Sequence, residues 1–278
     1  MLSPVVLIAG TSDLGTACAL RLFRTGLKVV LLEKSNPLDL YHSRCFSSAV
    51  FAGIKTIEQI KATTFSYFLT EISDKPLNSI EQFLNYQLEN RQIPVLLESE
   101  LNAIIAFKID FTIITSYDLF KNNSEVLKST GKIIGFDDKP IPDYFDYTIC
   151  NKGFNSSRVF YPFLEDEYIN EVAIPSVEKK CEKIRAPIEG IFEANKQINE
   201  IAHEKDILGK IAGIPILSPE RGKVTGILNS GLIVPAHEPF IEIDTREPYH
   251  NGKRISSESF SLAGGVLEAI NYNLNLNS

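Results

Sequence analysis

The hexapeptide GTSDLG, residues 10 to 15, constrains the fold more than any other part of the chain. A five-residue apolar run, "VVLIA", precedes it and is typical of a buried strand, and residues 16 to 24 follow with the apolar spacing of a helix. The segment "KVVLLE" then predicts a second strand that ends at Glu33, and Gly26 suits the left-handed turn after the helix. Together these features predict a βαβ unit of the Rossmann type.

The glycine turn differs from the dinucleotide-binding fingerprint at its middle position. In that fingerprint the first glycine permits the turn, the second lets a pyrophosphate approach, and the third lets helix and strand pack closely. Here the three positions are Gly10, Ser12 and Gly15, so Ser12 places a side chain where the pyrophosphate would lie. Glu33 follows Gly10 by 23 residues, near the usual place of a ribose-binding acid. The turn predicts Rossmann topology without close pyrophosphate contact, and the helix start could still attract an anion.

Alternating strands and helices continue through the rest of the first half. We expect strands at residues 94–97, 111–115, 132–136 and 146–150, a helix at 100–107, and another helix capped by Ser79. This alternation predicts a mainly parallel sheet with helices on both faces. We assign residues 1–175 to this Rossmann-like α/β domain.

The second half contains a duplicated unit. The segments PIEG (187–190) and AHE (202–204) recur as PERG (219–222) and AHE (236–238). Two β-rich units of about 30 residues cannot bury their apolar faces alone, so we expect them to interlock. Residues 176–246 therefore resemble a barrel-sandwich hybrid of the biotinyl/lipoyl type, with a C-terminal helix or tail at 247–278. The hairpin "KIAGIPIL" has no lysine at its Ala212-Gly213 tip, which argues against a carrier of a covalently bound group.

Charge and composition narrow the partners. The formal net charge is −7, so nucleic acid and membrane surfaces are not expected as partners. The four cysteines form no C-x-x-C pair and the four histidines show no ligand spacing, so no metal site is predicted. The repeated His203 and His237 are expected at equivalent structural positions, with a paired-histidine metal site as the alternative. No apolar run reaches the length of a membrane helix, and we expect a cytoplasmic protein.

Several stretches resemble one family, the accessory proteins of selenium-dependent molybdenum hydroxylase systems, which are related to the xanthine dehydrogenase accessory proteins. They are "DLGTACALRLFRTGLKVVLLE", "FSSAVFAG", "RAPIEGIFE" and "LAGGVLEAI". The resemblance implies a role in maturation of a molybdenum-containing hydroxylase, with that client enzyme as partner. It also implies that the molybdenum cofactor, a pterin, or the inserted sulfur or selenium is handled here.

The chain departs from that family at four places. The family's Gly-Ala-Gly-Asp-Leu is Gly10-Thr-Ser-Asp-Leu here, its Arg-Arg pair is Tyr-His with Arg44 nearby, its Gly-Pro-Gly-Phe loop begins at Gly135 and continues with two aspartates, and its Arg-Gly-His segment begins at Lys152. The resemblance places all four at the ligand side of the sheet. The residues expected to face a cofactor or small anionic ligand are Gly10, Ser12, Asp13, Gly15, Glu33, Arg44, Gly135, Lys152 and Arg158.

Two other functions stay open at this point. An NAD(P)-dependent oxidoreductase would use Gly10, Gly15 and Glu33 to hold its cofactor, although no proton-relay motif accompanies them. A degenerate paralogue with a structural or regulatory role would explain the aspartates that follow Gly135. The sequence leaves open whether the chain is an enzyme.

Overall fold

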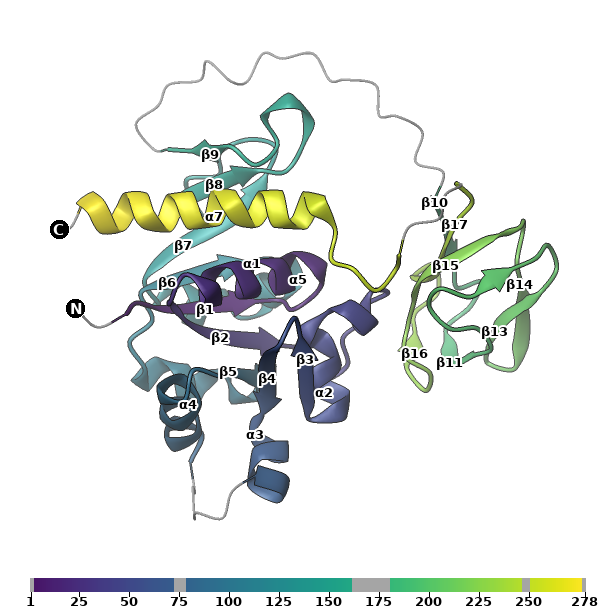
Figure 1. Ribbon diagram of the computed structural model, residues 1–278, viewed down its shortest axis with the longest axis horizontal. Coiled ribbons are helices and arrows are strands. Elements are labelled where there is room, and N and C mark those ends of the chain that lie inside the picture. Colours follow the sequence, from purple (N-terminus) through teal and green to yellow (C-terminus); the bar gives the residue numbers. More distant parts are fainter. Residues whose placement is uncertain (1–2, 73–78, 162–180, 247–250, 277–278) are drawn as a thin grey trace. The chain divides into compact units, whose positions relative to one another are not determined.

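The computed structural model describes residues 3–72, 79–161, 181–246 and 251–276 (Figure 1). The chain divides into two compact units. Unit 1 holds Met1–Ser35, Phe46–Ile174 and Ser256–Ser278, and unit 2 holds Asn36–Cys45 and Pro175–Ile255. The domain boundaries expected after residues 175 and 246 adjoin or lie among residues outside the described ranges, so their placement stays a prediction.

A nine-stranded sheet forms the centre of unit 1, in the order β3-β4-β5-β2-β1-β6-β7-β8-β9. Every neighbouring pair is parallel except β3–β4 and β8–β9. The six strands from β5 to β8 follow the 3-2-1-4-5-6 order of doubly wound sheets. The strands are β1 Val5–Ala9, β2 Lys28–Glu33, β3 Ile54–Ile57, β4 Ile60–Thr64, β5 Ile93–Leu97, β6 Phe111–Ile114, β7 Lys132–Asp137, β8 Tyr147–Cys150 and β9 Val159–Phe160. The mainly parallel α/β organisation expected from the sequence is confirmed.

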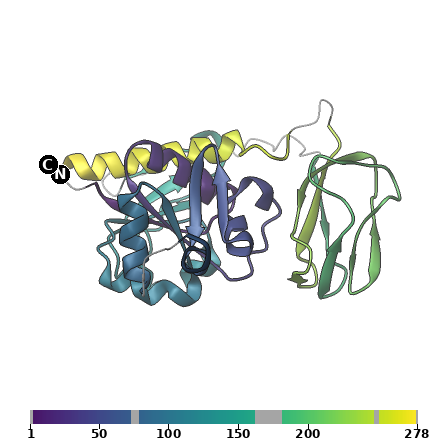
Figure 2. The same cartoon turned by 60° about the horizontal axis from the view of Figure 1, so that its bottom comes forward.

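Helices cover both faces of this sheet (Figure 2). On one face, α7 packs against α1, β8 and β9; on the other, α4 packs against β5 and β2. The alternation within β1 sets the two layers, since Leu7 and Ala9 join the core beneath α4 and Val6 and Ile8 are buried on the opposite side. The helices are α1 Asp13–Arg24, α2 Ala49–Ala52, α3 Phe65–Tyr67, α4 Ile80–Glu89, α5 Tyr117–Asn122, α6 Ser124–Lys128 and α7 Ser257–Leu276.

Short irregular helices complete the described elements. They are the 3₁₀ turns η1 His42–Arg44, η2 Phe46–Ser48, η4 Glu98–Ala106 and η5 Gly153–Asn155, and the π-helical turn η3 Phe68–Ile72. The segment expected as an α-helix at 100–107 is the 3₁₀ helix η4, whose start is fixed by the Glu100 carboxylate accepting a 2.8 Å hydrogen bond from the Leu97 amide. Ser79 caps α4 as expected, accepting a hydrogen bond from the Gln82 amide.

Unit 2 consists of two four-stranded antiparallel sheets, ordered β10-β17-β15-β12 and β14-β13-β11-β16. The repeat makes β10, β17, β15 and β12 of the first sheet equivalent to β14, β13, β11 and β16 of the second, in the same order. The duplicated sequence therefore produces two equivalent sheets. Each sheet takes two strands from each repeat, one of them a two-residue strand, and this exchange interlocks the halves. The strands are β10 Cys181–Arg185, β11 Gly190–Ala194, β12 Ile201–Ala202, β13 Ile207–Ile211, β14 Ile214–Leu217, β15 Gly222–Ile227, β16 Ile233–Val234 and β17 Pro239–Asp244. The expected β-rich C-terminal part is therefore confirmed.

A single apolar core lies between the two sheets of unit 2. Phe192 and Phe240, one from each repeat, meet there with ring centroids 5.1 Å apart. His203 and His237 each precede an equivalent strand, β13 and β17, as the repeat predicts. No cluster of three or more metal-binding side chains occurs among the described residues.

None of the described helices is both long and apolar enough to span a bilayer. The cytoplasmic location expected from the sequence stays a prediction.

Candidate functional site

The glycine turn follows β1 at the carboxyl edge of the unit 1 sheet. Gly10 has φ +106°, and the Thr115 hydroxyl donates a 2.8 Å hydrogen bond to its carbonyl. A Cβ on Gly15 would lie 2.0 Å from the Gly10 carbonyl oxygen, so Gly15 lets α1 start against the strand. Ser12 is the N-cap of α1 but its side chain makes no capping hydrogen bond. The first and third fingerprint positions therefore keep their structural roles.

Glu33, at the end of β2, is bonded to this same turn. One oxygen of its carboxylate accepts hydrogen bonds from the Thr11 amide at 2.8 Å and the Thr11 hydroxyl at 2.7 Å. The other accepts from the Lys34 amide at 2.8 Å, and only 6% of the residue is exposed. A buried carboxylate with three such donors is a structural bridge between β1 and β2.

Asp13, the first residue of α1, is bonded to the start of α7. One of its carboxylate oxygens accepts hydrogen bonds from the Ser256 hydroxyl at 2.7 Å, the Ser259 hydroxyl at 2.8 Å and the Ser256 amide at 3.2 Å. A carboxylate at two helix starts also interacts favourably with both helix dipoles. The negative charge that a helix start attracts is thus supplied by the chain itself.

Arg44 belongs to unit 2, whereas the other residues to which the resemblance points belong to unit 1. Its guanidinium lies 4.2 Å from the centroid of the Tyr41 ring and donates a 3.4 Å hydrogen bond to the Gly252 carbonyl. The Tyr41 hydroxyl in turn donates to Glu242 at 2.6 Å. These contacts fix residues 36–45 on unit 2.

The remaining predicted site residues lie at and beyond β7 and β8. A Cβ on Gly135 would lie 2.2 Å from the Phe145 ring, so this glycine makes room for a core aromatic and is not part of an open loop. The Lys152 ammonium forms a 3.1 Å ion pair with Asp138, and a side-chain hydrogen bond shared with Asp137 and the nearby Lys152 charge both lower the pKa of Asp138. Arg158 is exposed, and its carbonyl accepts a hydrogen bond from the Cys150 amide.

The structure therefore brings together only part of the predicted set. Gly10, Ser12, Asp13, Gly15 and Glu33 gather at the ends of β1 and β2, whereas Gly135 is committed to packing and Arg44 to unit 2. Ligand contact by any of them stays a prediction, as does binding of a small anionic ligand. Protein groups already donate hydrogen bonds to the Asp13 and Glu33 carboxylates.

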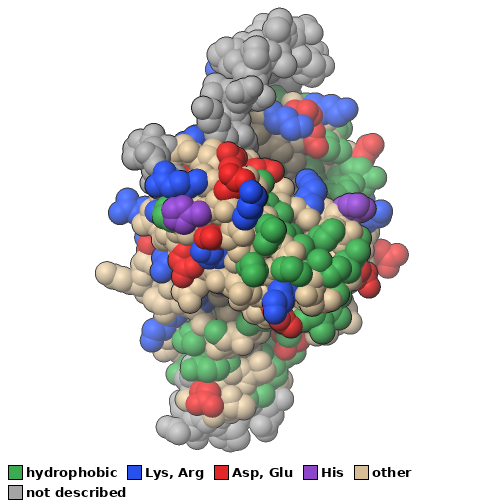
Figure 3. Space-filling model, turned by 90° about the vertical axis from the view of Figure 1, so that its right-hand side faces the viewer, with side chains coloured by type: hydrophobic (Ala, Val, Ile, Leu, Met, Phe, Trp, Pro, Cys, Tyr) green, Lys and Arg blue, Asp and Glu red, His purple; other side chains and the backbone are tan. Residues whose placement is uncertain are grey.

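A second surface, on unit 2, was not predicted from the sequence. We call it the apolar face: the outward side of sheet β14-β13-β11-β16, which carries the apolar side chains Ile191, Ile207, Pro215, Leu217 and Ile233 and the charged pair Glu193 and Lys210. Ile191 pairs with Ile233 across neighbouring strands, and Ile207 pairs with Leu217. Their exposures are 54%, 66%, 44% and 49% in that order. Figure 3 shows hydrophobic side chains gathered on the surface turned to the viewer.

The equivalent sheet has the opposite character. Its polar side chains Thr225, Glu242 and Asp244 lie outside the core cluster and yet are at most 8% exposed. Tyr41 donates to Glu242, and Arg246 forms a two-point ion pair with Asp244 at 2.8 Å. Segments of the chain thus cover the polar sheet, while the apolar sheet faces water. In the sequence, the only sign of this exposed surface is the alternation of apolar residues along the strands. A sheet face that is covered by other parts of the chain shows the same alternation, so the exposure could not be predicted.

No protein-family model matches the chain. The chain is 26% identical over 269 residues to YqeB of Escherichia coli strain K12, an uncharacterized protein; the match covers 96% of this chain and 47% of YqeB. The chain thus spans about half the length of the curated relative it matches.

Two matching solved structures come from one other family. One is an aspartoacylase family protein from Mesorhizobium loti, with 11% identity, a TM-score of 0.23, and coverage of 88% of this chain and 87% of that chain. The other is a succinylglutamate desuccinylase/aspartoacylase family protein from Shewanella amazonensis, with 12% identity, a TM-score of 0.24, and coverage of 88% and 91%. TM-scores this low establish no shared fold, and we transfer no activity from these proteins.

The comparisons nevertheless correct the identification made from the sequence. The two solved structures are described as aspartoacylase family proteins and not as molybdenum hydroxylase accessory proteins, so the comparisons contradict the expected family and its maturation function, and neither is proposed further. The NAD(P)-dependent oxidoreductase and the degenerate paralogue are not supported either. The physical reason is that the resembling stretches are packing elements: Gly10 and Gly15 form the turn, and "LAGGVLEAI" lies in α7 against α1. Such stretches report the scaffold and do not identify a client enzyme.

Proposed function

We propose that this chain is a protein-assembly unit that binds a second copy of itself through the apolar face of unit 2. The observation that carries the proposal is the difference between the two equivalent sheets of unit 2: the sheet with a polar outer side is covered, and the sheet with an apolar outer side is exposed. Several large apolar side chains exposed on one face of a sheet are typical of an interaction site.

The charges of this face favour a second copy as the occupant. Glu193 and Lys210 are cross-strand neighbours on the two central strands, β11 and β13. A twofold axis between these strands would place Glu193 of one copy opposite Lys210 of the other, twice per dimer, as in an isologous interface. The face therefore complements itself although the whole chain carries a net charge of −7.

The buried area sets the expected strength. The four isoleucine and leucine side chains of the face expose the equivalent of about two complete ones. Burying them in both copies contributes about 6–12 kcal/mol at ~1.5–3 kcal/mol per side chain, against an association cost of about 4–15 kcal/mol. The largest gain, about 12 kcal/mol, and the smallest cost, about 4 kcal/mol, leave a net binding free energy of about 8 kcal/mol, which corresponds to a Kd of about 1 µM. Self-association is therefore expected at micromolar or weaker affinity.

A charge-swap experiment tests this arrangement. Glu193→Lys and Lys210→Glu should each weaken self-association, because like charges then meet across the twofold axis. Mixing the two variants should restore dimers, because every contact across the axis again joins opposite charges. Native mass spectrometry of the mixture measures this directly. A mixture that contains only monomers, when the wild type dimerises, would reject the proposed geometry.

We further propose that unit 2 is a lysine-free barrel-sandwich hybrid of the biotinyl/lipoyl type. The interlocked sheets support this, as does the β13–β14 hairpin, which has Ala212 and Gly213 at its tip with positive φ. Neither residue offers an amine for a covalent carrier group.

A further inference from the structure

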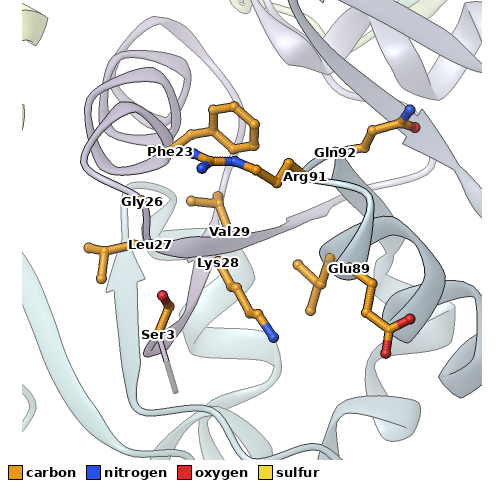
Figure 4. Close-up of a pocket in the computed structure, with 10 residues that line it drawn as sticks. Ser3, Phe23, Gly26, Leu27, Lys28, Val29, Glu89, Arg91 and Gln92 are labelled. Atoms are coloured by element: carbon orange, nitrogen blue, oxygen red, sulfur yellow. The ribbon is translucent and has the colours of Figure 1, made fainter. Parts of the chain in front are cut away.

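A cavity of about 310 Å³ opens in unit 1 at the amino-terminal edge of the sheet, away from the glycine turn. It lies where α1 and α4 end and β2 begins (Figure 4). Phe23, Leu27, Val29 and Leu88 supply apolar wall. Its size is at the lower end of the range for small-molecule sites.

The two helices that end at this cavity finish with the same turn but different residues. In α1 the left-handed position is Gly26, with φ +90°; in α4 it is Arg91, with φ +51°. Both turns have the paired backbone hydrogen bonds of a Schellman motif. In each, the bond that spans more residues runs from an amide to a carbonyl five residues earlier, from Leu27 to Leu22 and from Gln92 to Gln87. Glycine suits this position best, because a side chain strains a left-handed backbone. Strain of this kind is common at binding sites, and the Arg91 side chain borders the cavity.

The charged groups of the cavity are available to a ligand. The Arg91 guanidinium lies over the Phe23 ring, 5.7 Å from its centroid. Among the described residues, none bonds to the Lys28 ammonium or the Glu89 carboxylate, which line the same cavity. Figure 4 shows Lys28 and Glu89 on one side of it and the stacked Arg91 and Phe23 on the other.

The geometry points to a binding site for a small zwitterion of the α-amino acid class with an apolar side chain. Its carboxylate would meet Arg91, with Lys28 adding to the positive potential of the cavity, and its ammonium would meet Glu89 on the opposite side and the negative ends of the α1 and α4 dipoles. Its apolar body would pack on Phe23 and the aliphatic wall. This site is independent of the proposed self-association, which uses unit 2.

Calorimetric titration with L-leucine tests the proposal on the full chain. We expect a Kd of about 0.1–1 mM. 4-Methylpentanoate, which lacks the ammonium, and 3-methylbutylamine, which lacks the carboxylate, should each bind at least about tenfold more weakly. Glu89→Gln and Lys28→Gln should weaken leucine binding by a similar factor.

Arg91→Gly is the decisive variant. Glycine relieves the left-handed strain, so this variant should unfold at the same or a higher temperature than the wild type while losing leucine binding by at least about tenfold. Lys139→Gly, at an exposed lysine in the turn after β7 of unit 1, is the control and should bind like the wild type. The proposal is overturned if leucine shows no binding up to about 10 mM. It is equally overturned if Arg91→Gly binds normally, or if 4-methylpentanoate binds as well as leucine.

Discussion

The carboxylate of Asp13 accepts a 2.7 Å hydrogen bond from the hydroxyl of Ser256, a residue 243 positions further along the chain. This contact joins the first residue of α1 to the N-cap region of α7. It makes the C-terminal helix part of unit 1, where α7 packs along α1. The contact also holds the Asp13 carboxylate at the start of α1, where the sequence predicts that an external anion could bind.

Replacing Asp13 should therefore destabilise unit 1. Asp13→Ala leaves the Ser256 and Ser259 donors without their shared acceptor, so the free energy of unfolding should fall by about 1–3 kcal/mol. Urea unfolding followed by circular dichroism measures this change. Asp143→Ala, at an exposed aspartate, is the control and should stay within about 0.5 kcal/mol of the wild type. Equal stability of both variants would show that the link to α7 contributes nothing.

Gly135 should tolerate no side chain because of Phe145. Gly135→Ala is expected to lower the free energy of unfolding by about 1–3 kcal/mol, since the new methyl group overlaps the ring. If the overlap is the cause, Gly135→Ala should cost much less in a Phe145→Leu background than in the wild type. The double-mutant cycle tests this coupling. Additive effects would contradict the packing role.

Cys18 should make the stability of unit 1 fall at alkaline pH. Burial raises the pKa of this thiol from 9.0 to about 12, because the charged thiolate is disfavoured in the core. The unfolded chain loses the proton near pH 9 while the native chain keeps it, so the contribution is complete below pH 9 and declines above it. The expected slope is about 1.4 kcal/mol per pH unit.

Urea unfolding at several pH values from about 8 to 10.5 checks this slope. Cys18→Ala should show a shallower alkaline decline than the wild type. Leu22→Val, a buried α1 variant with no titratable group, should keep the steep decline. A wild-type slope unchanged in Cys18→Ala would assign the decline to other groups.

Local patterns predicted the parts of the fold that depend on neighbouring residues. β1 and β2 match the predicted strands because continuous apolar runs suit strands buried on both faces. Gly26 takes the predicted left-handed conformation, and the duplicated segments fold into two equivalent sheets. Each of these features is determined within about 30 residues of sequence.

The features that the sequence did not predict depend on distant contacts. Nothing near Asp13 shows that Ser256 will bond to it, and nothing near Tyr41 shows that Glu242 will hold it on unit 2. The family resemblance makes Gly135 the start of a loop, but the structure places it in β7 with Phe145 packed against it. Arg91 occupies a turn position that sequence rules assign to glycine. Ligand contact by the residues to which the family resemblance points stays a prediction, although the distant contacts of Asp13 and Gly135 show what else these two residues do.

Sedimentation equilibrium tests the central claim, that the apolar face of unit 2 binds a second copy, most directly. The wild type should show a monomer–dimer equilibrium at concentrations of about 1–100 µM. Ile233→Glu, which places a charge on a residue 66% exposed in the face, should be monomeric throughout. Ile105→Glu, at a residue 63% exposed in unit 1, should dimerise like the wild type. A wild type that stays monomeric up to about 100 µM, or a dimer that Ile233→Glu leaves intact, would contradict the claim.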